Sequence, residues 1–555
     1  MKFITSKDYC ILSLLLIILL FSSTKEDLPV HCLKSQIVGE WSFTLGKTTK
    51  LSSPSEKYSF TCEHAIPSHE STSYLTNDKK DKLQKEKVIN VSFFKDNTFT
   101  SSNNITGKWT MIYDEGFEFV MSENEKYFVF SKYDKKQTPG SKWTSYCHST
   151  LLGWFYKGDH WGCFYGNKKN VDLSQATNGE VENKQFYVQP SGSALKNFRF
   201  SQTTVQDFIN VSAEFRDHAK YVSMINNANF AWKAKHYSVL NGKSIGQIKE
   251  LIHEKKFYIG NTPFIKQNGN FIQNVIKGLE LKAQPSNGEH LNSNAQTITL
   301  PKHFNWLNHI SEARQQGNCG SCYAMSFISA LEARFRIKYE TQLKSYKNYF
   351  GDDLKKFSLS VNHVIKCSYY NQGCDGGYSY LVGKFFNEFE VYLDQCFDAS
   401  KNQCTQYCKE EELNNIHLGV SDYYYVGGAY GKSNEKNIMR DLYLNGPLTV
   451  SFEPEENFAT YSSGVYTGTK KTINEIVKAY NKKYVLKRPQ WEKVDHSILL
   501  VGWGEEEIDG NIVKYWVIQN SWGTQWGKNG FGKFLRGVDL DGIESIAEAA
   551  IPLIK

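Results

Sequence analysis

The chain has 555 residues, which is too long for one hydrophobic core and indicates two or three domains. Hydrophobic residues make up 40% of the sequence and aromatic residues 14%, a composition that excludes a disordered chain. The formal charge of +7, from 65 basic and 58 acidic residues, comes without a basic block and therefore predicts no nucleic-acid partner.

The first segment, residues 1–26, has the pattern of a secretory signal peptide. Lys2 and Lys7 precede an apolar run from Ile11 to Phe21, and small polar residues follow the run. A membrane anchor is the alternative, but the run is shorter than the roughly 20 apolar residues that span a bilayer, and no second candidate follows. We predict no membrane span and a protein of the secretory pathway, either lysosomal, vacuolar or secreted.

Residues 27–170 have the pattern of a small antiparallel β-barrel. Aromatic and β-branched strands are expected at Lys108–Tyr113, Phe117–Met121 and Lys126–Tyr133, with a turn at residues 114–116. The region holds enough cysteines for two disulfides, namely Cys32, Cys62, Cys147 and Cys163.

The composition changes twice after the predicted barrel. Residues 171–299 contain no cysteine and many polar residues and glycines, with one expected helix at Val211–Lys235, so we predict a weakly structured linker or removable propeptide. Residues 300–555 regain clear patterns, including buried-type strands at Ile498–Gly502 and Tyr515–Gln519. This third and largest segment is predicted to be a mixed α+β unit.

Cys322 is the candidate nucleophile. It directly precedes a helical pattern from Ala324 to Arg336, so its thiol is expected at a helix N-terminus, where the helix dipole lowers a thiol pKa. Of the 12 cysteines, Cys10 leaves with the signal peptide, and the odd remainder indicates one free thiol. Gln316 offers a side-chain donor for a developing oxyanion. The alternative is that Cys322 is one more disulfide partner.

His496 and Asn520 are the candidate partners of this thiol. His496 opens the buried-type strand at Ile498–Gly502, which would hold the imidazole on a rigid element. Asn520 closes another strand, where its amide is placed to orient the imidazole, and Trp522 is placed to shield that contact from water. A histidine alone is usually an ordinary core or surface residue. His496 is a candidate only because Cys322 and Asn520 are also present.

The cysteine, histidine and asparagine segments, in this order, resemble those of the papain family of cysteine peptidases. The resemblance implies an α+β fold with a two-lobed catalytic domain, one lobe helical and the other a β-barrel, preceded here by an antiparallel β-barrel. It also implies that Gly376 and Gly377, after Cys374, form the backbone edge that binds an extended substrate.

The chain from Asp27 onward resembles the dipeptide-releasing branch of that family in four further segments. These segments are 145–147, 319–323, 425–428 and 543–547. In that branch the N-terminal barrel is an exclusion domain that closes one end of the cleft, and its terminal aspartate binds the substrate ammonium. The resemblance assigns this role to Asp27, provided that trimming follows signal-peptide removal, because Glu26 is a poor residue before a signal-peptidase cut. An ordinary solvated acid is the alternative.

The same resemblance implies several ligands and modifications. Chloride is expected near the pocket for the second substrate side chain, held by Tyr380 and Tyr425, and no metal is expected. The implied disulfides are Cys32–Cys147, Cys62–Cys163, Cys319–Cys374, Cys367–Cys404 and Cys396–Cys408. A zinc cluster is the alternative for five cysteines of the third segment, which contain no CxxC pair among themselves: Cys367, Cys374, Cys396, Cys404 and Cys408. Sequons for N-glycosylation occur at Asn90, Asn104 and Asn210.

The sequence therefore predicts a cysteine-type aminodipeptidase that acts on peptides and proteins with free N-termini. The first alternative is a papain-type endopeptidase with an open cleft, which has the same chemistry. The second is a secreted binding protein without turnover, against which the presence of Cys322, His496 and Asn520 argues. Related enzymes assemble as tetramers, and the resemblance leaves a homo-oligomer open.

Overall fold

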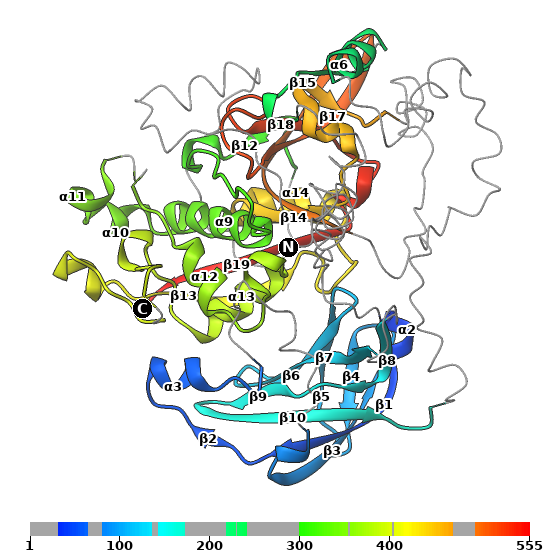
Figure 1. Cartoon of the computed structure of the whole chain (residues 1–555), viewed down its shortest axis with the longest axis vertical. Coiled ribbons are helices and arrows are strands. Elements are labelled where there is room, and N and C mark those ends of the chain that lie inside the picture. The colour runs from blue at the N-terminus through cyan, green and yellow to red at the C-terminus, as the bar shows by residue number, and fades with distance from the viewer. Residues whose placement is uncertain are drawn as a thin grey trace, which may run out of the picture.

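The fold is that of a computed structural model of the chain. It describes residues 32–64, 80–135, 143–171, 218–228, 230–240, 299–352, 354, 356–401, 404–469 and 494–555. A barrel of blue and cyan strands forms the lower part of Figure 1, and a larger unit of helices and strands lies above it. We refer to residues 32–171 as the N-terminal barrel and to residues 230–240 together with 299–555 as the C-terminal unit.

The N-terminal barrel is built from ten antiparallel strands. They are β1 (Gly39–Gly46), β2 (Thr49–Lys50), β3 (Lys85–Phe93), β4 (Thr98–Ser101), β5 (Thr106–Ile112), β6 (Gly116–Ser122), β7 (Glu125–Lys135), β8 (Trp143–Thr150), β9 (Gly153–Lys157) and β10 (His160–Lys168). The sheet closes because β1 pairs with both β3 and β10. Two short helices, α2 (Lys34–Ile37) and α3 (Pro54–Ser59), and a 3-10 turn at Lys80–Lys82 flank it.

Aromatic side chains fill the interior of the N-terminal barrel. Along β1, Trp41 and Phe43 are fully buried and alternate with partly exposed residues, as the two-residue period of a strand requires. The Phe43 ring meets Phe119 with ring centroids 5.2 Å apart, and Phe119 stacks on Tyr127 at 4.6 Å. The strands and turn that the sequence predicts between residues 108 and 133 are present as β5, β6 and β7.

The C-terminal unit combines helices with a nine-stranded sheet. Its helices are α9 (Cys322–Lys338), α10 (Glu340–Lys344), α11 (Lys347–Phe350), α12 (Val361–Cys367), α13 (Ser379–Glu388) and α14 (Glu435–Asn445). Its strands are β11 (Trp232–Ala234), β12 (Phe304–Asn305), β13 (Leu418–Tyr425), β14 (Leu448–Phe452), β15 (Tyr461–Tyr466), β16 (His496–Ile508), β17 (Asn511–Gln519), β18 (Phe531–Leu535) and β19 (Ile546–Ile554). Short 3-10 turns lie at 238–240, 307–309, 373–375, 394–396, 411–415, 456–460 and 540–542.

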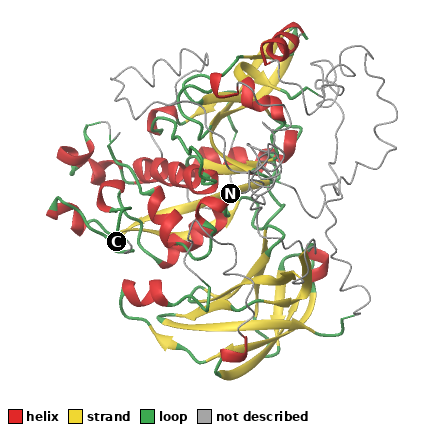
Figure 2. Cartoon of the chain, viewed as in Figure 1, coloured by secondary structure: helices red, strands yellow, loops and turns green. Residues whose placement is uncertain are grey.

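The helix α9 forms the centre of the C-terminal unit. Figure 2 shows it between further helices on one side and strands on the other. It packs against β16, β19 and α13, and its side chains are buried around almost its whole circumference, as befits a core helix. Even Arg334 is buried, where it pairs with Asp441 at 2.6 Å and donates to the backbone oxygen of Pro447 at 2.7 Å.

The segment predicted to be a weakly structured linker is ordered where it is described. The expected helix at Val211–Lys235 is wrong at its C-terminal end, because the helix α6 spans His218–Asn227 and the chain then forms β11. Pairing with β15 favours the strand, since it buries Trp232 to 1% exposure at the sheet edge. The Asn226 side chain reinforces the turn by bonding the N–H of Ala234 at 2.8 Å.

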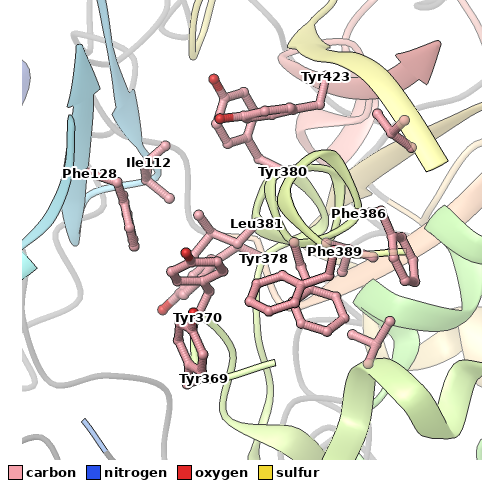
Figure 3. Close-up of a cluster of buried hydrophobic side chains, with 14 of the residues drawn as sticks. Ile112, Phe128, Tyr369, Tyr370, Tyr378, Tyr380, Leu381, Phe386, Phe389 and Tyr423 are labelled. Atoms are coloured by element: carbon pink, nitrogen blue, oxygen red, sulfur yellow. The ribbon is translucent and has the colours of Figure 1, made fainter. Parts of the chain in front are cut away.

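The two units share one continuous buried contact. Figure 3 shows Ile112 and Phe128 of the N-terminal barrel facing a cluster of aromatic residues from the C-terminal unit. Phe128 meets Tyr370 edge to face at 5.5 Å between ring centroids, and Tyr58 donates to or accepts from His363 Nε2 at 2.7 Å. The barrel is therefore docked on the helical side of the C-terminal unit, against α12 and α13.

Candidate active site

The candidate nucleophile Cys322 is the first residue of α9. The Ser321 carbonyl accepts hydrogen bonds from the N–H groups of Ala324 and Met325 at 3.0 and 2.9 Å, so the helix is formed from its first turn. The free N–H groups of such a turn carry partial positive charge, which favours a thiolate over a thiol. Cys322 is 8% exposed and, among the described cysteines, stands alone outside a disulfide.

The loop before Cys322 is fixed to the segment that carries Gly376 and Gly377. The disulfide Cys319–Cys374 joins the two segments, and Gly320 N–H donates to the Cys374 carbonyl at 2.8 Å. Close packing explains the glycine at 377, because a Cβ there would lie 2.8 Å from the Tyr323 ring. The predicted substrate edge and the predicted nucleophile are thus held in one rigid assembly.

His496 and Asn520 form a hydrogen bond of 2.8 Å between Nε2 and Oδ1. An amide oxygen only accepts, so the imidazole proton lies on Nε2 and Nδ1 remains for proton exchange. His496 is the first residue of β16 and pairs with Phe452 of β14, and it is 3% exposed. The Trp522 ring stacks on the imidazole, with centroids 4.8 Å apart, and covers this bond.

Gln316 is linked to the same group through Ser521. Its backbone N–H donates to the Ser521 carbonyl at 2.9 Å, and the Ser521 hydroxyl donates to its Oε1 at 2.6 Å. Its Nε2 donates to the Cys319 carbonyl at 3.2 Å, beside the loop that leads to Cys322. These contacts place an amide donor between the nucleophile loop and the segment of Asn520. The motifs, far apart in the chain, are therefore brought together at α9 and β16.

Tyr380 and Tyr425 lie together as expected of a joint site, with stacked rings whose centroids are 4.4 Å apart. Their surroundings include two buried acids that sequence reasoning missed, Glu118 and Glu548. Tyr380 donates to Glu118 at 2.8 Å. A usable signal for Glu548 existed, since it is one acid within the otherwise apolar run of residues 546–551. The Tyr380 hydroxyl that a bound anion needs as a donor is already used by the Glu118 carboxylate, which does not fit a bound anion.

Five disulfides are formed, and they are the pairs that the resemblance implies. They are Cys32–Cys147, Cys62–Cys163, Cys319–Cys374, Cys367–Cys404 and Cys396–Cys408. Two bridges therefore lie in the N-terminal barrel and three in the C-terminal unit. Because the five cysteines of the zinc alternative, Cys367, Cys374, Cys396, Cys404 and Cys408, are all in disulfides, none of them is left to bind zinc.

Several predicted residues lie outside the described part of the chain. These are Asp27, Asn210 and residues 1–26. Of the other sequons, Asn104 is exposed in the turn between β4 and β5, and Asn90 is partly buried in β3. Within the described ranges, no helix is long and apolar enough to cross a membrane, and no group of His, Cys, Asp and Glu side chains is placed to hold a metal ion.

Comparison with known proteins gives two matches to family models. Residues 300–551 match the papain family cysteine protease, and residues 27–168 match the cathepsin C exclusion domain. Cathepsin C of Schistosoma mansoni is 26% identical over 98% of both chains. Dipeptidyl aminopeptidase 1 of Plasmodium falciparum is 26% identical over 80% of this chain and 79% of its own.

A third relative covers less of the chain. Cathepsin B-like protease 1 of Arabidopsis thaliana is 32% identical over 42% of this chain and 56% of its own length. The relative named cathepsin C, which covers 98% of this chain, includes the N-terminal barrel. With both family models matched in this order, the chain belongs to the papain family of cysteine peptidases and carries a cathepsin C exclusion domain.

Proposed function

We propose that the chain is a cysteine-type aminodipeptidase, which removes dipeptides from the free N-termini of peptides and proteins. The observation that carries this proposal is the contact of the exclusion domain with both halves of the peptidase domain beside the candidate catalytic residues. Its relatives named cathepsin C and dipeptidyl aminopeptidase 1 support the same activity.

The tip of the β5–β6 hairpin makes this contact. Tyr113 bonds the Ser451 hydroxyl at 3.1 Å, and Ser451 bonds the Ser497 hydroxyl at 2.9 Å, one residue from His496. Glu115 of the same turn accepts a hydrogen bond from Tyr378, the residue after Gly377. The hairpin tip therefore reaches the histidine strand on one side and the predicted substrate edge on the other. A substrate chain extended past these residues meets the exclusion domain.

The chemistry follows from the site geometry. The Cys322 thiolate attacks the carbonyl carbon of the second peptide bond, and the carbonyl oxygen becomes an oxyanion held by Gln316 Nε2 and the Cys322 backbone N–H. His496, charged at Nδ1, gives that proton to the departing amine as the C–N bond breaks, which leaves a dipeptide thioester. Water, deprotonated by His496, then releases the dipeptide and restores the thiol.

Asn520 and Trp522 are positioning residues in this scheme. The Asn520 side chain is itself held, because its Oδ1 also accepts the Ser521 N–H at 2.8 Å, and the Asn520 backbone N–H donates to the Gly530 carbonyl at 2.9 Å. The imidazole therefore keeps one orientation while Nδ1 takes and gives a proton. Burial of the stacked Trp522, at 1% exposure, keeps water from competing for the Nε2 bond.

We further propose that Asp27 receives the substrate ammonium, and that the enzyme is made in the secretory pathway. A cation at the closed end of a cleft needs a carboxylate, since an unpaired buried charge is costly. The five disulfides fit an oxidising compartment, and the exposed Asn104 is a suitable glycosylation site. These features leave the lysosome and the cell exterior as destinations.

The experiment that tests the activity compares a dipeptide reporter substrate with its N-acetylated form. A charge-assisted hydrogen bond contributes on the order of 1.5 to 3 kcal/mol, so acetylation is expected to lower kcat/KM about ten- to hundred-fold. The variant Asp27→Ala is expected to lose the same factor on the free substrate while its thiol stays reactive toward a small alkylating reagent.

The rival activity makes the opposite prediction. An open-cleft endopeptidase cleaves acetylated and free substrates alike and cuts internal bonds of long peptides. If the enzyme cleaves both substrates equally well and cuts internal bonds, the exclusion domain does not block the cleft and the aminodipeptidase proposal is wrong. If neither substrate is cleaved while an active-site thiol probe labels Cys322, the chain is a binding protein that has kept the fold.

A further inference from the structure

The buried contact between the two units contains a cluster of phenol and carboxyl groups that the catalytic chemistry does not use. We call it the tyrosine–glutamate cluster, and its members are Tyr113, Glu118, Tyr380, Tyr423, Tyr425 and Glu548. All six side chains are at most 7% exposed. It includes the two tyrosines to which the resemblance assigns a chloride ion.

Glu548 lies directly beside both of these tyrosines. It stands opposite Tyr425 in the pairing of β13 with β19, which places the two side chains on the same face of the sheet. The Tyr380 backbone lies near enough to the Glu548 carboxyl to influence its pKa, and the Tyr113 hydroxyl donates to Glu548 Oε1 at 2.8 Å. Glu548 is 0% exposed, so these groups are its whole surroundings on that side. A carboxyl oxygen thus fills the space between the tyrosine pair and the exclusion domain.

The other hydroxyl donors of the cluster are already committed to Glu118. Tyr380 and Tyr423 donate to the two carboxylate oxygens of Glu118 at 2.8 and 2.5 Å. Lys384 Nζ lies 3.5 Å from the same carboxylate. An anion bound at Tyr380 would have to take a hydroxyl donor from Glu118 and would then lie next to that carboxylate, which repels it.

Two buried polar atoms of the cluster, Tyr425 Oη and Glu548 Oε2, make no close hydrogen bond among the described residues, and the Tyr113 backbone lies beside the Tyr425 hydroxyl. The two atoms belong to residues that are directly paired on the adjacent strands β13 and β19 and therefore lie on the same face of the sheet. Burial raises the pKa of Glu548 to about 8, so in an acidic compartment its carboxyl group carries a proton and can both donate and accept. A phenol and a protonated carboxyl group are complementary as donor and acceptor, so a carboxyl group beside Tyr425 supplies the kind of acceptor that a halide would supply.

We propose that the Glu548 carboxyl group takes the place of the chloride ion at Tyr380 and Tyr425, so that this pocket is complete without a halide. The carboxyl oxygen supplies the acceptor that a halide would otherwise supply, and it is covalently attached to β19. The sequence feature responsible is one acid in an apolar strand. The activity arm of the test rests on the proposed aminodipeptidase function, while the binding arms do not.

The binding arms use the purified full chain and the variant Glu548→Ala, with Glu507→Ala, an exposed acid on β16, as the matched control. Thermal unfolding is measured in sodium chloride and in sodium gluconate at equal ionic strength, and crystals grown in bromide are examined for anomalous signal. For the unaltered chain and Glu507→Ala, we expect equal midpoints in both salts and no bromide in the cluster. For Glu548→Ala, we expect a higher midpoint in chloride and a bromide ion between Tyr380 and Tyr425.

The activity arm measures dipeptide release in the same two salts. The unaltered chain is expected to change less than about twofold, and Glu548→Ala to become about tenfold more active in chloride, since one charge-assisted contact is regained. The proposal is overturned if bromide binds in the cluster of the unaltered chain, and this outcome does not depend on whether the variant folds. It is also overturned if chloride stabilises the unaltered chain as much as it stabilises Glu548→Ala. A folded Glu548→Ala that gains no halide response also overturns it. If no variant releases dipeptides, the proposed function fails, and the unfolding and bromide results still decide the role of Glu548.

Discussion

The catalytic group and the tyrosine–glutamate cluster are both buried polar assemblies, but they are built in different ways. The catalytic group comes from short motifs in which each functional residue begins or ends an element, as Cys322 begins α9 and His496 begins β16. The tyrosine–glutamate cluster comes from single residues on strands and a helix of two domains. Glu118, for example, lies in the barrel strand β6, and its partner Tyr423 lies in β13 of the other unit.

The difference shows what each assembly does. The catalytic group is positioned within one unit, so its chemistry needs only the papain-like domain. The tyrosine–glutamate cluster exists only when the exclusion domain is docked, because its carboxyl groups and phenols come from both sides of the contact. Variants in the first assembly should therefore change turnover and spare stability, whereas variants at the domain contact should change stability.

Removing the nucleophile is the largest test of this division. We expect Cys322→Ala to lower kcat by about 10⁴-fold or more, because no other group supplies the attacking atom. Cys322 lies outside the disulfides, so all five bridges remain and the unfolding midpoint should change little. Steady-state assays and thermal unfolding of the same preparation measure both quantities. Appreciable hydrolysis by pure Cys322→Ala would contradict the assignment.

The two partners of the thiol should differ in effect. His496→Ala removes the group that moves the proton and is expected to cost about 10³- to 10⁴-fold in kcat, whereas Asn520→Ala removes its orienting contact and should cost about 10- to 100-fold. The 2.8 Å bond from Nε2 to Oδ1 is the contact at issue. Assays over a pH series separate the roles, because loss of orientation should shift the pH profile. Equal losses in both variants would refute the division of labour.

The elements that carry the proposed catalytic group could be predicted from the sequence because their signals are local. The helix after Cys322 and the strand that follows His496 have clear periodicities, and α9 and β16 appear where these patterns place them. The same holds for the hairpin of β5 and β6, whose turn residues mark it. Each of these elements is specified by neighbours in the chain, so one sequence is enough.

The domain contact could not be predicted because its partners are far apart in the chain. Glu118 and Tyr380 are separated by more than 200 residues, and no local pattern pairs them. The strand β11 was missed for the same reason, since only pairing with β15 decides its conformation over a helix. Buried acids in apolar strands, such as Glu548, are the one local signal that marks such contacts.

Replacement of the buried Lys384 side chain tests how much one cation stabilises the domain contact. Lys384 is 1% exposed and lies 2.5 Å from Glu388 and 3.5 Å from Glu118. Lys384→Met keeps the length of the side chain but leaves two buried carboxylates without their cation, and loss of one partner of a buried pair costs about 3 to 5 kcal/mol. We expect a lower unfolding midpoint and easier dissociation of the exclusion domain, measured by thermal unfolding and limited proteolysis. The exposed-lysine variant Lys436→Met is the control, and an equal effect in both would contradict the role of Lys384.

The smallest expected effect is the dependence of stability on pH. Burial raises the pKa of Glu548 to about 8 from an ordinary 4.5, so the folded state holds this proton more tightly than the unfolded state. The stability that this proton gives to the folded state is complete below about pH 4.5 and is lost as the pH rises through about 8. The midpoint of thermal unfolding is therefore expected to fall by a few degrees over that pH range. Because the side chain of Glu548→Gln cannot ionise, the unfolding midpoint of this variant should decrease less with rising pH. Burial also raises the pKa of Glu544, to about 7, so Glu544 should cause the rest of the decrease in the unfolding midpoint. In Glu544→Gln the decrease should be reduced over a pH range that ends about one pH unit lower than the range for Glu548. Parallel profiles for the unaltered chain and Glu548→Gln would show that the carboxyl group is not protonated in the cluster.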